Sequence, residues 1–231
     1  NYEVSKSGDI SALINFDLNQ TNLSLESFDW YKSSGRSGYA KLKILGKEGL
    51  ERKNIKYYVN APGLLVQGQA LVSISTRNNQ ISDFNIDNFK MNRSNFSMQG
   101  AYDNSGVPSI FISGESLDLR SVIQDTFKDK NKKQIPFKLN ISKKKELNKI
   151  LLGKETILLK PEGVLVHDGS KWTNIDITGV LSNGGPIEIK MQTLNGVRSV
   201  QVNTNDGGGL LSALDWINTI EGGSLHLNGK Y

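Results

Sequence analysis

The chain has 231 residues, of which 37% are hydrophobic, and it carries a net charge of +5 and no cysteine. The absence of cysteine excludes a disulfide framework, a thiol nucleophile and a cysteine-based metal site, and no apolar run approaches the ~20 residues of a membrane-spanning helix. The low hydrophobic share and the 23 glycines disfavour a compact α/β enzyme. Because the chain starts at Asn1 rather than at a methionine and ends in a strand pattern at Tyr231, we expect a piece of a longer protein.

Most of the chain alternates apolar and polar residues with a period of two, as half-buried β-strands do. The first run has an apolar face made of Ile10, Ala12, Ile14, Phe16 and Leu18. The longest run extends from Leu64 to Ile74, and Gly68 in its middle suits a bend or a close approach. Turn residues follow about every ten positions, including Pro161-Glu162-Gly163. This spacing predicts a mainly β fold built as a long antiparallel meander.

Two short segments instead have the spacing of an amphipathic helix. The stronger lies near residues 209–218, where Asn205 or Asp206 can cap the N-terminus and the apolar stripe consists of Leu210, Leu211, Leu214 and Ile217. A weaker copy lies about 91 residues earlier, with Asp118 placed to cap and a stripe of Leu119, Val122, Ile123 and Phe127. We therefore predict two short helices and two repeats, one spanning residues 1–127 and the other residues 128–231.

Candidates for metal chemistry are weak. Asp83, Asn85 and Asp87 resemble a calcium loop, but Asn88 and Ser94 replace the glycine and the glutamate that such a loop requires. The two histidines, His167 and His226, have no ligand spacing, so we expect them to be solvated or to line turns. The sequence contains neither a nucleophile elbow nor a phosphate loop. We predict no enzymatic activity, no cofactor and no metal site.

Two other features have an ordinary explanation. The glycines of residues 207–209 precede a helix and could hold an anion, but no P-loop lysine follows, which favours a cap and turn. Residues 128–149 are rich in lysine and could touch anionic lipid or nucleic acid. Because no aromatic residues alternate with these lysines, we expect solvated loops and no nucleic-acid partner.

The apolar faces of the strands are the main feature that needs an explanation. Period-two alternation makes one face of the sheet apolar along its whole length, and two short helices cannot cover it. Either two sheets close on each other as a sandwich, or one sheet curls into an open trough. The alternation alone is compatible with both.

A resemblance favours the trough. The segment from Asp206 to Leu227, a turn with Asp, a Leu-rich helix and a Gly-Gly-x-Leu-x-Leu strand, resembles the C-terminal region of AsmA-like bacterial envelope proteins, and residues 114–119 are similar to another signature of that family. The resemblance implies a curled, taco-like β-groove that carries phospholipid between the inner and outer membranes and supports envelope integrity. It also implies a periplasmic location, an inner-membrane anchor in the full-length protein, membrane contact through that protein, and neighbouring repeats of the same chain as partners.

Residues expected to line such a groove and bind lipid acyl chains are Phe16, Val66, Val72, Phe96, Met98, Phe137, Ile175, Ile177, Ile187, Ile189, Leu225 and Leu227. Some of them could equally belong to a closed core. Two alternatives remain open. A closed β-sandwich or β-helix adhesin would bind glycan or protein through exposed aromatic residues such as Trp30, Tyr31, Tyr57 and Tyr58, whereas a structural scaffold module would bind no ligand.

Overall fold

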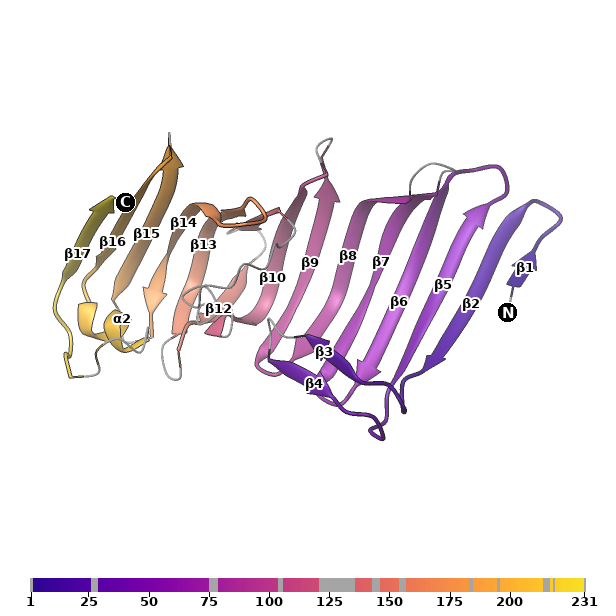
Figure 1. The fold of residues 1–231 in the computed structure, drawn as a ribbon, viewed down its shortest axis with the longest axis horizontal. Helices are drawn as coiled ribbons and strands as arrows, with labels where there is room; N and C mark the ends of the chain where they lie inside the picture. Colours follow the sequence, from indigo (N-terminus) through magenta and orange to yellow (C-terminus); the bar gives the residue numbers. More distant parts are fainter. Residues whose placement is uncertain are drawn as a thin grey trace. The chain divides into compact units, whose positions relative to one another are not determined.

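The computed structural model describes residues 2–25, 29–74, 79–103, 106–120, 136–142, 146–153, 157–182, 185–194, 196–213, 217 and 219–230. The fold is mainly β (Figure 1). The chain divides into two compact units, Asn1–Gly106 (unit 1) and Val107–Tyr231 (unit 2). This division falls before the repeat boundary predicted after residue 127. Because the two units are defined by contacts and not by sequence similarity, the predicted sequence repeat stays a prediction.

Unit 1 is built on one antiparallel sheet with the strand order β1-β2-β5-β6-β7-β8-β9. Each strand pairs with the strand beside it in this order, and short turns such as Pro62-Gly63 and Asn92-Arg93 connect β6 with β7 and β8 with β9. The alternation of apolar and polar residues explains these strands, because it lets a pleated strand present one apolar face. The strands are β1 (Tyr2–Val4), β2 (Asp9–Asp17), β5 (Tyr39–Lys47), β6 (Arg52–Ala61), β7 (Leu64–Ile74), β8 (Asn79–Met91) and β9 (Ser94–Tyr102).

A small hairpin of β3 (Leu23–Leu25) and β4 (Trp30–Lys32) interrupts the meander between β2 and β5. It lies against the β6–β7 turn, where the Trp30 indole N–H donates to the carbonyl of Pro62 at 3.1 Å. The ammonium group of Lys32 is buried and donates to the carbonyls of Leu18, Thr21 and Ser33 at 2.6–3.2 Å. Since a buried charge needs such compensation, Lys32 fixes the hairpin to the end of β2.

Unit 2 is built on a second run of strands followed by one described helix. The strand order is β10, then β11 and β12 end to end in one position, then β13-β14-β15-β16-β17. The helix α2 (Gly207–Ala213) connects the last two strands. The strands are β10 (Pro108–Asp118), β11 (Phe137–Ile141), β12 (Leu147–Leu151), β13 (Ile157–His167), β14 (Trp172–Leu181), β15 (Pro186–Leu194), β16 (Val197–Thr204) and β17 (Leu225–Lys230).

The prediction of a purely antiparallel meander is wrong at one place. Both β11 and β12 run parallel to β10, one along each half of it, and both run antiparallel to β13. Parallel neighbours cannot be joined by a tight turn, and the chain between them is 18 residues long, from Leu119 to Pro136. The alternation of apolar and polar residues does not reveal whether two strands pair in parallel or antiparallel, because the pattern within a strand is the same in both cases.

A second correction concerns Pro161-Glu162-Gly163, which the sequence predicts to be a turn. These residues lie inside the continuous strand β13 at a β-bulge, where the register with β14 shifts between Leu159 and Glu162. Lys160 (φ 47°) and Gly163 (φ 154°) have positive φ there. Because a bulge uses the same turn-forming residues as a loop, composition alone does not separate the two.

The helix predicted near 209–218 is present as α2 over Gly207–Ala213, and residues 214–216 and 218 lie outside the described residues. The helix predicted over 119–127 falls almost entirely outside the described residues, so the described part of the chain contains one helix instead of two. In that part, α2 is too short to cross a membrane, and no candidate membrane span is found.

Candidate functional site

The register of unit 1 places apolar side chains from six adjacent strands in one row. Residues directly opposite each other in an antiparallel pair share a face. We call the face that carries this row the apolar face of unit 1. The row runs through Phe16, Ala40, Val59, Val66, Phe89 and Phe96.

A second row on the same face runs parallel to the first. Val72 lies four positions after Gly68 on β7, so its side chain is on the same face, where it pairs with Ile81 of β8. The five residues of unit 1 that the sequence assigns to a groove, from Phe16 to Met98, therefore lie on one face. The second row consists of Ile14, Leu42, Tyr57, Gly68, Ile86 and Met98.

The apolar face of unit 1 is buried only in part. Phe89 and Phe96 are buried and stacked with their ring centroids 4.5 Å apart, whereas Phe16 and Ile14 on the edge side are 42% and 40% exposed. Ile81 is 43% exposed. All described strands of unit 1 belong either to the run of sheet strands from β1 to β9 or to the β3–β4 hairpin. Among the described residues, unit 1 therefore supplies no second large sheet to close over this face.

Two glycines on the apolar face leave room for groups that a Cβ would displace. A Cβ on Gly68 would stand 2.1 Å from the carbonyl oxygen of Asn85 and 2.7 Å from the hydroxyl of Tyr57. A Cβ on Gly100 would stand 2.2 Å from the ring of Phe84, its cross-strand neighbour. The close approach expected at Gly68 is confirmed, since a neighbouring backbone and a tyrosine hydroxyl occupy the space of its Cβ, and Gly100 leaves room for the Phe84 ring.

The sheet of unit 2 has an equivalent arrangement, which we call the apolar face of unit 2. Ile175 and Ile177 of β14 lie opposite Met191 and Ile189 of β15, and Gly179 lies opposite Ile187. Phe137 lies opposite His167 on the same face at the β11 side. The remaining members toward the C-terminal edge are Val200, Val202, Leu225 and Leu227. All seven groove residues predicted in unit 2 thus share a face, on which Ile177 and Ile187 are buried and Leu227 is 39% exposed.

The helix α2 sits at one end of this face. The Asp206 carboxylate accepts from the Gly209 N–H at 3.0 Å, so the predicted cap is Asp206. The N–H groups of Gly207 and Gly208 donate to the carbonyls of Gly223 and Gly222 at 2.6 and 2.9 Å. A Cβ on Gly208 would stand 2.4 Å from the carbonyl oxygen of Ile220. The glycines at the start of α2 therefore allow both the sharp turn that the sequence suggests and a close contact with the backbone of residues 220–223.

Asp118 has the geometry expected of a cap, since its Oδ1 accepts from the Arg120 backbone N–H at 3.2 Å and from the Arg120 Nε at 2.8 Å. The carboxylate of Asp118 raises the pKa of Arg120 through these hydrogen bonds. Most of the helix that Asp118 would cap lies outside the described residues.

His167 lines a turn, which is one of the two settings expected for the histidines, and it does so from a buried position. Its ring is buried, stacks on Phe137 at 5.7 Å and meets the edge of Trp172 at 5.1 Å. Its Nδ1 accepts from the Gly169 N–H at 3.0 Å, so it lines a turn, as expected, but is not solvated. Burial lowers the pKa of His167. His226 is exposed, and its Nδ1 lies 3.2 Å from Oδ1 of Asn203.

The other candidates are scattered. Asp83, Asn85 and Asp87 lie within β8 rather than in a loop, and among the described residues no group of three or more potential ligands could hold a metal ion. The basic segment of residues 128–149 is described only at 136–142 and 146–149, where Lys149 lies 3.6 Å from Glu115.

The aromatic residues of the adhesin alternative do not form one surface. Trp30 is buried, which contradicts its expected exposure, because its indole packs under the β6–β7 turn. Tyr57 lies on the apolar face of unit 1, with its hydroxyl on the carbonyl of Asn85, whereas Tyr58 lies on the opposite face. Tyr31 is 63% exposed and donates to Asn22.

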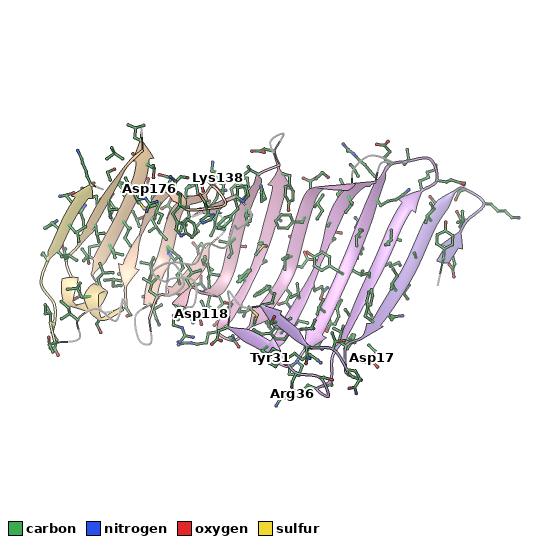
Figure 2. All side chains as sticks on the ribbon, viewed as in Figure 1. Asp17, Tyr31, Arg36, Asp118, Lys138 and Asp176 are labelled. Atoms are coloured by element: carbon green, nitrogen blue, oxygen red, sulfur yellow. The ribbon has the colours of Figure 1, made fainter. Side chains whose placement is uncertain are left out.

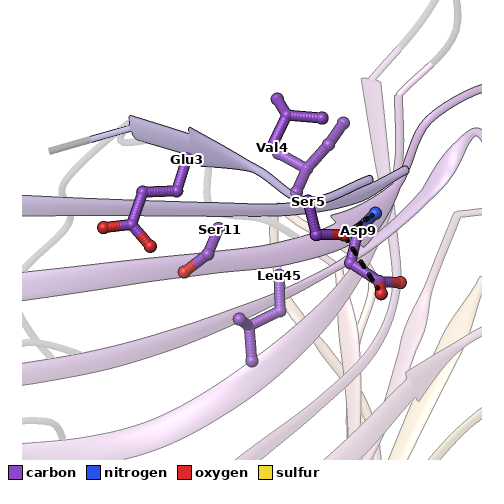
Figure 3. A pocket seen from close by; sticks show the side chains of 8 residues that line it. Glu3, Val4, Ser5, Asp9, Ser11 and Leu45 are labelled. Carbon is purple, nitrogen blue, oxygen red and sulfur yellow. Dashed lines mark hydrogen bonds between the residues drawn. The ribbon is translucent and has the colours of Figure 1, made fainter. Parts of the chain in front are cut away.

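A shallow hollow lies at the N-terminal edge of unit 1, between β1, β2 and β5 (Figure 3). Its polar groups bond locally, since the Asp9 N–H donates to Ser5 Oγ at 3.0 Å and Ser7 Oγ donates to Asp9 Oδ2 at 2.5 Å. This is an ordinary turn arrangement without chemistry of its own.

No family model, curated protein or solved structure matches this chain. The apolar faces therefore stand as the candidate site on their geometry alone. Alternation in the sequence also indicates Val59, Phe84, Phe89, Met191 and Val202 as members of these faces, but the list of groove residues omits them.

Proposed function

We propose that the chain is a non-enzymatic segment of a bridge-like lipid-transfer protein, in which the apolar faces form an open groove for phospholipid acyl chains. The observation that supports this most directly is the continuous row of apolar side chains across the sheet of unit 1, from the 42% exposed Phe16 to the buried Phe96, without a facing sheet of that unit among the described residues. A closed sandwich would bury such a row.

The energetics suit a conduit rather than a catalyst. Moving one acyl chain into water exposes methylenes at about 0.8 kcal/mol each, on the order of 10 kcal/mol in total. A continuous apolar surface that replaces this water lowers the barrier to transfer without any covalent step. Phospholipid headgroups would remain in water at the strand ends.

The wider setting of the proposal comes from the resemblance to AsmA-like envelope proteins. It comprises a periplasmic location, transport between the inner and outer membranes, and an anchor and further repeats in the full-length protein.

The test in unit 1 compares two neighbouring positions on β7. Val66→Asp puts a charge on the apolar face between Val59 and Phe89, whereas Gln67→Asp puts the same charge on the opposite face between Tyr58 and Asn88. We expect lipid extracted from the purified protein, and fluorescent fatty-acid binding, to fall at least about tenfold in Val66→Asp and to stay unchanged in Gln67→Asp, because burying a lone carboxylate is costly.

A second pair, Val202→Asp and Gln201→Asp on β16, makes the same comparison in unit 2. Circular dichroism establishes that each variant is folded. Equal lipid binding by both members of each folded pair, or no lipid bound by the wild-type chain, would rule out the apolar faces as the lipid site.

A further inference from the structure

The opposite face of the unit 1 sheet carries an unusual cluster of cationic and aromatic side chains. On β5 and β6, Lys41 lies opposite Tyr58 and Lys43 lies opposite Lys56. The ring of Tyr39 stacks on that of Tyr58 at 5.5 Å, and the Lys41 ammonium lies 5.5 Å from the Tyr39 ring centroid. We call these five residues the basic patch. Its three lysines are exposed.

The pair Lys43 and Lys56 is electrostatically unfavourable. Like charges directly opposite each other on antiparallel strands destabilise a sheet. The flanking residues in the register offer no carboxylate, since Lys43 faces Leu13 on β2 and Lys56 faces Gln69 on β7. No described carboxylate forms an ion pair with these lysines.

The nearest carboxylates on β2 are at its two ends. Asp9 lies opposite Lys47, and Asp17 lies opposite Tyr39 at the end of the strand near Tyr31 and Arg36 (Figure 2). Asp83 and Asp87 also lie on this face, but on β8, two strands from β6, where Asn85 donates to Asp87 at 2.6 Å. The part of this face that β5 and β6 form is therefore positively charged between the strand ends.

Unit 2 shows the usual solution to the same problem. On β15, Lys190 forms an ion pair with Glu188 at 2.5 Å and lies opposite Asp176 of β14. Glu188 accepts a further hydrogen bond from Asn203 at 3.1 Å. The pKa of Lys190 is raised by Glu188 and that of Glu188 is lowered by Lys190. Because the chain balances a lysine with acids there and not in the basic patch, an external anionic partner would complete the patch.

The companions of the lysines indicate the kind of partner. Tyrosine is favoured at the level of lipid headgroups, and Leu13 beside Lys43 is 38% exposed. A single-stranded nucleic acid would need free ring faces for base stacking, but Tyr39 and Tyr58 stack on each other. We propose that the basic patch binds the surface of an anionic phospholipid bilayer, so that one face of the sheet contacts headgroups and the other contacts acyl chains.

The test uses the full chain and vesicles of phosphatidylcholine with or without about 30 mol% phosphatidylglycerol. We expect co-sedimentation with the anionic vesicles only. Each Lys→Gln change should weaken binding about fivefold, so that Lys43→Gln with Lys56→Gln lowers it about 25-fold. The control double variant, Lys160→Gln with Lys171→Gln, removes the same charge from exposed positions of unit 2 and should bind like the wild type. Thermal unfolding should show that Lys43→Gln is no less stable than the wild type, because it relieves a repulsion.

Equal binding to both vesicle types, equal losses in the two double variants, or tighter binding to a single-stranded oligonucleotide than to the anionic vesicles would each overturn the proposal. The experiment is independent of the proposed function. Val66→Asp should lose bound lipid but still sediment with anionic vesicles, whereas the lysine double variant should do the reverse.

Discussion

At the scale of single residues, glycine positions in the sheet differ sharply in what they tolerate. Gly68→Ala would force a Cβ to 2.1 Å from a backbone carbonyl oxygen, whereas Gly229, on β17, has no atom within 4 Å of its would-be Cβ. We expect Gly68→Ala to lower the free energy of unfolding by about 1–3 kcal/mol because of overpacking. Gly229→Ala should change it little. Urea unfolding followed by tryptophan fluorescence measures both, and equal effects would contradict the close approach at Gly68.

His167 predicts a pH dependence of stability. Because burial lowers its pKa in the folded state, the unfolded chain takes up the proton first as the pH falls below about 6.5. This contribution to stability is complete above that pH and declines as the pH drops toward the folded-state value. The slope of unfolding free energy between about pH 7 and about pH 5.5 should be smaller in His167→Phe than in the wild type. His226→Phe, which removes an exposed imidazole, is the control, and identical slopes in His167→Phe and wild type would exclude this role.

Some single-residue features could be foreseen and others could not. In β8, the apolar spacing is three from Ile81 to Phe84 and again from Ile86 to Phe89, and register irregularities with β7 and β9 fall at these places. A break in period two therefore marks a bulge. The burial of Lys32 has no comparable mark in the sequence. Its three partners are backbone carbonyls from separate parts of a loop, and residue types do not reveal such partners.

At the scale of elements, Asp206 determines how α2 begins. Its Oδ1 caps the helix, while its buried Oδ2 has no hydrogen-bond partner among the described residues. We expect Asp206→Ala to cost about 1 kcal/mol of stability. Asp206→Asn should be neutral or stabilising, because it keeps the accepting oxygen and removes the charge from a site with one unpaired oxygen. Calorimetric melting temperatures test this, and an Asn variant as unstable as the Ala variant would mean that the charge, not the cap, matters.

Prediction of the elements succeeded where the signal is local. Alternation located the long strand Leu64–Ile74, and a helical stripe located α2. The parallel placement of β11 and β12 beside β10, and the pairing of Leu23–Leu25 with β4, depend on contacts between distant segments. Strand direction and partner choice leave no trace in the pattern of a single strand, so these were missed.

At the scale of the whole molecule, partly exposed apolar faces predict self-association of lipid-free protein. Large contiguous apolar surface is rare on monomeric soluble proteins, yet Ile14, Phe16 and Ile81 each remain at least 40% exposed on one face. Size-exclusion chromatography with light scattering should show oligomers after delipidation and monomers in mild detergent. Gln67→Asp should behave like the wild type, whereas Val66→Asp should reduce association. A delipidated wild-type chain that stays monomeric at every concentration would contradict the prediction.

The apolar faces themselves were predictable because the side-chain period of a strand is fixed at two. Each predicted groove residue, from Phe16 to Leu227, shares a face with the others of its unit. Whether that face is covered depends on which elements lie over it, and the alternation of a strand is equally compatible with a sandwich.

The connectivity of unit 1 has a consequence for how such a protein can change its length. From β5 to β9, every strand pairs with the next one in the chain. Duplicating one hairpin would therefore add two neighbours without rewiring any existing pair, and at about 4.8 Å per strand it would extend the row of apolar side chains by roughly 10 Å. A closed barrel changes its radius when it gains strands. In the strand order of unit 1, an added hairpin would change only the length of the row of apolar side chains, so successive insertions during evolution would lengthen that row in equal increments.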